Sequence, residues 1–119
     1  MGMVRTVAVV FGAIYVLAGV SGFVLDTPLF GLFEVSAVHN IAHIVLGAIL
    51  LYGATSTSAA IMATRGVGAV LVILGLLGFV DPLGATLPLG GNDIWLHLVT
   101  GAILLAAGFM GGSAETSAA

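Results

Sequence analysis

The stretch HNIAHIVLGAILL, residues 39–51, decides the fold because most of it occurs a second time in the chain. Its last nine residues, HIVLGAILL, return 54 positions later as HLVTGAILL, residues 97–105, with seven of nine residues identical. After its first histidine, each copy runs almost entirely through apolar residues, as membrane-spanning helices do. The sequence therefore contains one helical segment twice.

A second pair of segments precedes the first pair at nearly the same spacing. GAIYVLAGVSGFV (residues 12–24) and GAVLVILGLLGFV (residues 68–80) lie 56 positions apart and share seven of thirteen residues. Asp26 and Asp81 follow these segments, and a proline comes shortly after each aspartate. Two spanning helices used twice form a parallel repeat about the membrane normal. We predict an all-α fold, a four-transmembrane-helix bundle built from two parallel-repeated helical hairpins.

The composition places the protein in a membrane. Of its 119 residues, 61% are hydrophobic and 6% are charged, and the mean hydropathy is +1.30. Soluble domains carry about 25% charged residues, so this chain could not cover itself with a polar surface. Two arginines are too few for a nucleic-acid-binding face. The absence of cysteine excludes disulfides, thiolate metal sites and iron–sulfur clusters.

Four apolar runs come close to the length of about 20 residues that crosses a bilayer. Backbone groups in lipid must be hydrogen-bonded within their own segment, so these runs are helices. We place them at residues 7–25, 35–53, about 60–80 and 94–112. A single domain then covers residues 1–113, with hairpins at about 4–54 and 60–112, and residues 114–119 form a flexible C-terminal tail.

The charged residues predict the orientation. Arg5 precedes the first span and Arg65 begins the third, so both fall on the same side of a four-span protein. The positive-inside rule makes that side cytoplasmic. The acids near the spans fall in the two loops of the opposite side: Asp26, Glu34, Asp81 and Asp93. We expect a multi-pass protein of the cell (inner) membrane with cytoplasmic N- and C-termini.

Glycines recur at matched positions and predict close helix packing. The first and third spans share the pattern G-x6-G-x2-G, which places three glycines on one helix face. Small residues on one face let a second backbone approach closely in a membrane. The predicted packing glycines are Gly12, Gly19, Gly22, Gly68, Gly75, Gly78, Gly47 and Gly101.

Polar residues near the outer ends of the second and fourth spans form the candidate site. Ionisable residues inside a span raise a functional hypothesis. His39 and His43 are four residues apart, as are Asp93 and His97, so each pair shares a helix face. The repeat also predicts that His43 and His97 approach each other. The full candidate cluster is His39, Asn40, His43, Asp93, His97, Asp26 and Asp81.

Three ligand-based interpretations of this cluster are open. His39, His43, Asp93 and His97 could supply four ligands to zinc or a similar ion. His43 and His97 could alternatively hold a haem between two helices. The histidines could also belong to a proton or ion path, with an aspartate as partner.

A structural interpretation is favoured over all three, and it requires neither metal nor cofactor. Asp93 and Ser36 are placed to cap the N-termini of their helices. Asp26 and Asp81 follow helix C-termini, where the dipole disfavours an acid, so each needs a partner. His43 and His97 could serve, each fixing an outer loop to the bundle.

Two segments resemble a known family. HNIAHIVLGAILL and PLGGNDIWLHLVTGAILL are similar to the Asn-x-x-His-x-x-x-Gly and Asn-x-Asp-x-x-Leu-His segments of the DUF4383 family, small four-span bacterial membrane proteins of unknown function. The resemblance covers about residues 3–112 and rests on Asn40, His43, Gly47, Asn92, Asp93, Leu96 and His97. It implies the fold and the membrane location, and it implies no activity. His39 has no fixed place in the family pattern.

From the sequence we expect a non-catalytic scaffold or accessory membrane component. No serine–histidine–aspartate spacing and no glycine-rich phosphate loop are present, so we do not expect an enzyme. The partners expected are the lipid bilayer and either further copies of the chain or a larger membrane complex. The alternative is a metal-, haem- or proton-linked binding or transport protein that uses the histidines near the outer face.

Overall fold

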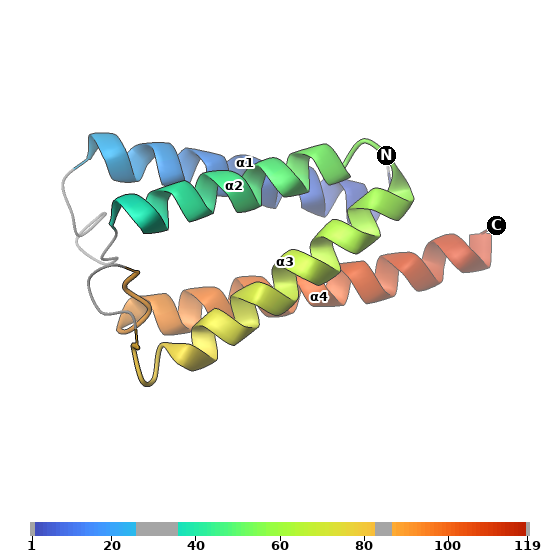
Figure 1. Cartoon of the computed structure of the whole chain (residues 1–119). Helices are drawn as coiled ribbons and strands as arrows, with labels where there is room; N and C mark the ends of the chain where they lie inside the picture. The colour runs from blue at the N-terminus through green and yellow to red at the C-terminus, as the bar shows by residue number, and fades with distance from the viewer. Residues whose placement is uncertain (1, 26–35, 83–86, 119) are drawn as a thin grey trace.

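The chain folds into four helices arranged as two hairpins (Figure 1). The computed structural model describes residues 2–25, 36–82 and 87–118, with side chains as far as Gly111. The helices are α1 (Met3–Val24), α2 (Ala37–Gly53), α3 (Thr57–Leu77) and α4 (Asn92–Ala118). No strand occurs in these residues. The predicted all-α bundle of two repeated hairpins is confirmed.

Both chain ends and the α2–α3 connection lie at one end of the bundle (Figure 1). The first residues of α2 and α4, which carry the histidines, lie at the opposite end (Figure 1). α1 packs along α2, and α3 packs along α4. The two hairpins therefore point the same way, as a parallel repeat requires.

Serine side chains define where two of the helices begin. The Ser36 hydroxyl accepts a hydrogen bond from the His39 backbone N–H at 3.2 Å, so the predicted cap of α2 is confirmed. Ser56 caps α3 in the same way through the Ala59 N–H. The predicted cap of α4 was wrong. Because α4 already begins at Asn92, Asp93 lies inside its first turn, where an acid still favours the helix dipole.

Three of the helices are long and apolar enough to cross a membrane: α1, α3 and α4. α2 is apolar but has 17 described residues, at the lower limit of about 17 for a spanning helix. The backbone of α4 continues to Ala118, where the sequence suggested a separate tail after residue 113. This end of the chain contains no proline, the residue that opposes a helix most strongly, so its sequence permits a helical backbone.

Glycines bring the two helices of each hairpin into backbone contact. A Cβ atom added to Gly47 would lie 2.6 Å from the carbonyl oxygen of Gly12, and one added to Gly12 would lie 3.0 Å from that of Gly47. In the second hairpin, Gly68 and Gly101 face each other in the same way, at 2.9 and 2.8 Å. The two contacts occupy matched positions of the repeat, so the duplication seen in the sequence is also a duplication of packing.

The remaining predicted glycines extend this contact toward the histidine-bearing end. Cβ atoms added to Gly19 and Gly75 would lie 2.6 Å from the Asn40 carbonyl oxygen and 2.7 Å from the Leu98 side chain. Gly22 lies against the Asn40 side chain, and Gly78 against the Leu89 carbonyl oxygen.

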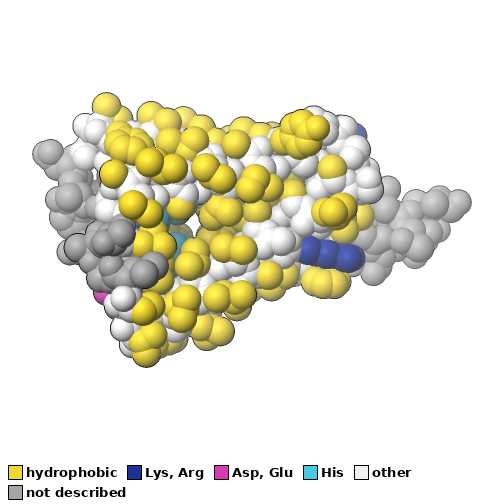
Figure 2. All heavy atoms as spheres, viewed as in Figure 1, with side chains coloured by type: hydrophobic (Ala, Val, Ile, Leu, Met, Phe, Trp, Pro, Cys, Tyr) yellow, Lys and Arg dark blue, Asp and Glu magenta, His cyan; other side chains and the backbone are white. Residues whose placement is uncertain are grey.

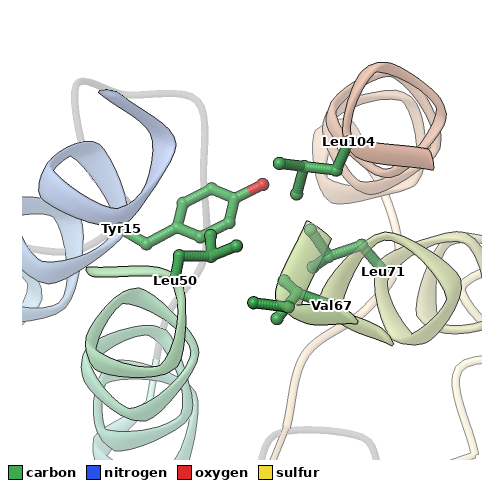
Figure 3. Packing of buried hydrophobic residues seen from close by; sticks show 6 residues of the cluster. Tyr15, Leu50, Val67, Leu71 and Leu104 are labelled. Atoms are coloured by element: carbon green, nitrogen blue, oxygen red, sulfur yellow. The ribbon is translucent and has the colours of Figure 1, made fainter. Parts of the chain in front are cut away.

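Large apolar side chains join the two hairpins. Tyr15 and Leu50 from the first hairpin point toward Val67, Leu71 and Leu104 of the second (Figure 3). The outer surface is apolar as well, with hydrophobic side chains spread over the helices (Figure 2). Both the core and the outer surface of the bundle are therefore apolar, as expected of helices that lie in a bilayer.

The glycine contacts lead to a paired prediction for stability. Gly47→Ala places a methyl group against the backbone of α1, and overpacking of this kind costs about 1–3 kcal/mol. Gly66→Ala is the matched control, because a Cβ there meets nothing within 4 Å. Alanine in an exposed helix is favoured over glycine by about 0.5–1 kcal/mol. Thermal unfolding in detergent should show a lower Tm for Gly47→Ala and an unchanged or higher Tm for Gly66→Ala. Equal Tm values would contradict the packing assignment.

Candidate metal centre

The three histidines of the chain converge between the hairpins. His39 and His43 come from α2 and His97 comes from α4, and one nitrogen of each ring lies within 4.8 Å of the other two. The centroid distances are 4.5 Å between His39 and His43, 5.8 Å between His39 and His97, and 6.4 Å between His43 and His97. His43 and His97 thus meet across the bundle, and His39 completes a triangle.

The positions of the helices explain why the rings meet. His39 and His43 are one turn apart on the same face of α2, and Ser36 fixes where that helix begins. His97 lies just over one turn into α4. His39 and His97 are buried, with 3% and 2% of their surfaces exposed, whereas His43 is partly exposed. Three polar rings are therefore held together inside an apolar bundle.

The cavity beside the rings is small. Its volume is about 20 Å³, enough for one water molecule or one bare ion. Its lining combines the three histidines with apolar side chains: Ala42, Leu46, Leu71, Leu74, Leu87 and Leu89. A porphyrin does not fit between the described residues at this site, so the haem interpretation is not supported.

The ring positions fit a transition-metal ion after a small inward movement. Donor atoms no more than 4.8 Å apart leave a central point at most about 2.8 Å from each (4.8 Å divided by √3), and a zinc–imidazole bond measures about 2.0–2.1 Å. Each ring would need to move inward by less than about 1 Å, which is within reach of a small side-chain rotation.

A buried nitrogen atom also favours a ligand at this place. His97 Nδ1 is buried and has no hydrogen-bond partner among the described residues. A buried polar atom left unpaired costs about 1–3 kcal/mol. Coordination of a metal by that nitrogen, or by the other nitrogen of a ring turned over, would remove this cost.

Asp81, one of the predicted aspartates, interacts with the protein backbone and not with a histidine. Asp81 Oδ1 accepts a hydrogen bond from the Leu89 backbone N–H at 3.0 Å, so this side chain fixes the segment before α4 through a backbone group. The proposed pairing of Asp81 with His97 was therefore wrong. Asp81 has a φ of 43°, a left-handed conformation that aspartate tolerates better than most residues. Asp26 lies outside the described residues.

Asp93 and Asn40 are not part of the converging cluster. Asp93 is buried in the first turn of α4, one turn before His97, but its carboxylate is not among the groups that converge. Asn40 packs against Gly22 of α1. Of the four predicted metal ligands, His39, His43 and His97 come together, and Asp93 does not.

Sequence reasoning missed the aromatic neighbour of the cluster. The Tyr15 ring lies 5.8 Å from the ring of His43 and belongs to the core between the hairpins. The one available signal was a tyrosine in the middle of an apolar span, far from the interfaces where tyrosine is usual.

The fold and the site define an all-α membrane protein with a histidine cluster between two repeated hairpins. The family described as a domain of unknown function, DUF4383, matches residues 5–110. The chain belongs to this family, which confirms the resemblance seen in the sequence. No curated protein and no solved structure matches the chain.

Proposed function

We propose that the protein is a metal-binding membrane component that holds one divalent transition-metal ion between His39, His43 and His97. The convergence of three ring nitrogens within 4.8 Å supports this proposal. Two ligands come from the first hairpin and one from the second, so the ion would cross-link the two hairpins. The proposal adopts the metal-binding alternative that the sequence left open beside the scaffold or accessory role, and it includes no catalysis.

The ligand set favours zinc and its neighbours in the periodic table. Imidazole nitrogen suits zinc, copper, nickel and cobalt, whereas magnesium and calcium prefer oxygen. Three histidines leave one coordination position open on a tetrahedral ion. Asp93 precedes His97 by one turn and is buried, so its carboxylate is placed to offset the charge of the ion from outside the ligand set.

The cluster suits a bound ion better than a proton path. A path through the bilayer needs titratable groups along its whole length. In the described helices, the histidines and Asp93 lie together at one end. The described buried side chains between this cluster and the α2–α3 connection include no acid and no further histidine: Tyr15 reaches in from α1, Thr64 donates its hydroxyl to the Ala60 carbonyl oxygen, and leucine, valine and alanine supply most of the rest.

We propose an inner-membrane location with both termini in the cytoplasm, which places the histidines in the outer half of the bilayer. The arginines support this orientation. Arg5 Nε donates to the Ala54 carbonyl oxygen at 2.8 Å, beside the α2–α3 connection. Arg65 lies about two turns into α3, with its guanidinium 4.1 Å from the Phe109 ring centroid. Both cations thus belong to the half of the bundle opposite the histidines.

Metal analysis tests the binding proposal. Protein purified with a histidine-free affinity tag and supplied with Zn²⁺ should retain about one ion per chain. The triple variant His39→Ala, His43→Ala and His97→Ala should retain none. Zn²⁺ should also raise the Tm of the unmodified protein, since an ion at 100 times its Kd stabilises by about 2.7 kcal/mol.

Leu46→Ala is the control for this experiment, because it enlarges the same cavity and leaves all three imidazoles in place. It should bind Zn²⁺ with the same stoichiometry despite a lower Tm. The metal site would be refuted if the triple variant retained zinc, or if Zn²⁺ left the Tm of the unmodified protein unchanged.

The orientation is tested with introduced cysteines, since the chain has none of its own. In intact cells, a membrane-impermeant maleimide should label Asn92→Cys, near the start of α4, and should leave Thr55→Cys, in the α2–α3 connection, unlabelled until the cells are lysed. The reverse pattern would show that the histidine end faces the cytoplasm.

A further inference from the structure

An arginine lies on the outer surface of α3, one of the helices long and apolar enough to cross a membrane. Arg65 comes eight residues after Thr57, the first residue of this helix, which corresponds to about 12 Å along its axis. Its side chain is partly exposed. Figure 2 shows arginine atoms over α3 and α4, with hydrophobic side chains around them. A charge at this depth is costly in hydrocarbon, so it requires polar partners.

Contacts with α4 hold the guanidinium of Arg65 in one orientation. Its Nε donates a hydrogen bond to the Gly108 carbonyl oxygen at 3.3 Å, and its central carbon lies 4.1 Å from the Phe109 ring centroid. An aromatic face attracts a cation placed over it. A Cβ atom added to Gly108 would lie 2.7 Å from Arg65 Cγ, so this glycine leaves room for the arginine side chain.

The two terminal amino groups of this guanidinium have no hydrogen-bond partner among the described residues. The two acids with described side chains lie at the other end of the bundle, since Asp81 follows α3 and Asp93 is in the first turn of α4. The surface beside the arginine is open, because a Cβ atom added to Gly66 would meet nothing within 4 Å. Paired N–H donors in one plane match the oxygen atoms of a carboxylate or a phosphate. An anion that fits them has to come from outside the described residues.

We propose that Arg65 binds the phosphate of an anionic phospholipid, whose acyl chains lie against the apolar surface of α3 and α4. The exposed side chains around the guanidinium are apolar: Met62 one turn before it on α3, and Phe109 and Met110 on α4. A phospholipid matches both the cation and this surface, whereas a free phosphate ion matches only the cation. The orientation proposed above places the site in the cytoplasmic leaflet, where basic side chains between spanning helices attract anionic lipids. The inference does not depend on the metal site.

Native mass spectrometry tests this site by resolving the lipids bound to the protein in detergent. The protein is titrated with dioleoyl phosphatidylglycerol and with dioleoyl phosphatidylcholine, which share their acyl chains and differ in net charge. Phosphatidylglycerol should bind about fivefold more tightly, the effect expected of one arginine on an anionic lipid. An excess of inorganic phosphate should leave this lipid bound, because the free ion makes no contact with the apolar surface.

Arg5→Gln is the matched control for Arg65→Gln, because both variants remove one positive charge from the same end of the bundle. The guanidinium of Arg5 is already used by the backbone: Nε donates to the Ala54 carbonyl oxygen at 2.8 Å and Nη2 to that of Thr55 at 3.5 Å. The preference for phosphatidylglycerol should disappear in Arg65→Gln and remain in Arg5→Gln. If Arg65→Gln folds poorly, Arg65→Lys serves in its place. It keeps the charge but loses the paired donors, so it should bind phosphatidylglycerol less tightly than the unmodified protein.

Three results would overturn the inference. Equal losses in Arg65→Gln and Arg5→Gln would show that the lipid responds to the charge of this end of the bundle and not to a site. Release of the lipid by inorganic phosphate would show a site for the free ion. A preference that appears only in Glu115→Gln would assign the guanidinium to this acid, which lies in α4 beyond the described side chains. All of these variants keep the three histidines, so none of the results bears on zinc binding.

Discussion

The structure depends on the contact between glycine backbones inside each hairpin. Gly12 and Gly47 face each other in the first hairpin, and Gly68 and Gly101 do so in the second, at distances that leave no room for a side chain. In a bilayer, apolar side chains gain little by leaving lipid, so helices associate through close packing of this kind. The contact fixes how α2 lies on α1 and how α4 lies on α3. This glycine contact therefore determines where the histidines of α2 and α4 lie.

Duplication of this hairpin explains how a site arises between two packed units. His43 and His97 occupy matched positions of the repeat, so an arrangement of the hairpins about a common axis brings them together. At the matched positions one turn earlier, the first hairpin has His39 and the second has Asp93. The site is therefore asymmetric, with two imidazoles from α2, one imidazole from α4 and a buried carboxylate nearby.

Much of the fold could be predicted from the sequence, because apolar length and repeat spacing determine helix number and direction. The Ser36 cap could also be predicted, since it depends on residues three positions apart. The C-terminal end of α4 could not be predicted, because small polar residues without proline permit both a helix and a tail.

The site was only partly predictable, because side-chain contacts depend on the rotation of the helices about their axes. The repeat placed His43 near His97, and the four-residue spacing placed His39 on the same face of its helix as His43. The same spacing also predicted Asp93 as a ligand, and Asp93 does not join the three rings. Asp81 was expected to need a partner, and its partner is the Leu89 backbone N–H, which no sequence pattern indicates. Tyr15 reaches the cluster from α1 by tertiary packing alone.

The most direct test of a metal held by both hairpins is X-ray absorption spectroscopy of the zinc-loaded protein. The spectrum counts the imidazole ligands and gives their distances. We predict three imidazole nitrogens at about 2.0–2.1 Å, falling to two in His97→Ala, where the second hairpin no longer contributes a ligand. A zinc ion bound mainly by oxygen, or a spectrum that His97→Ala leaves unchanged, would contradict a site shared between the hairpins.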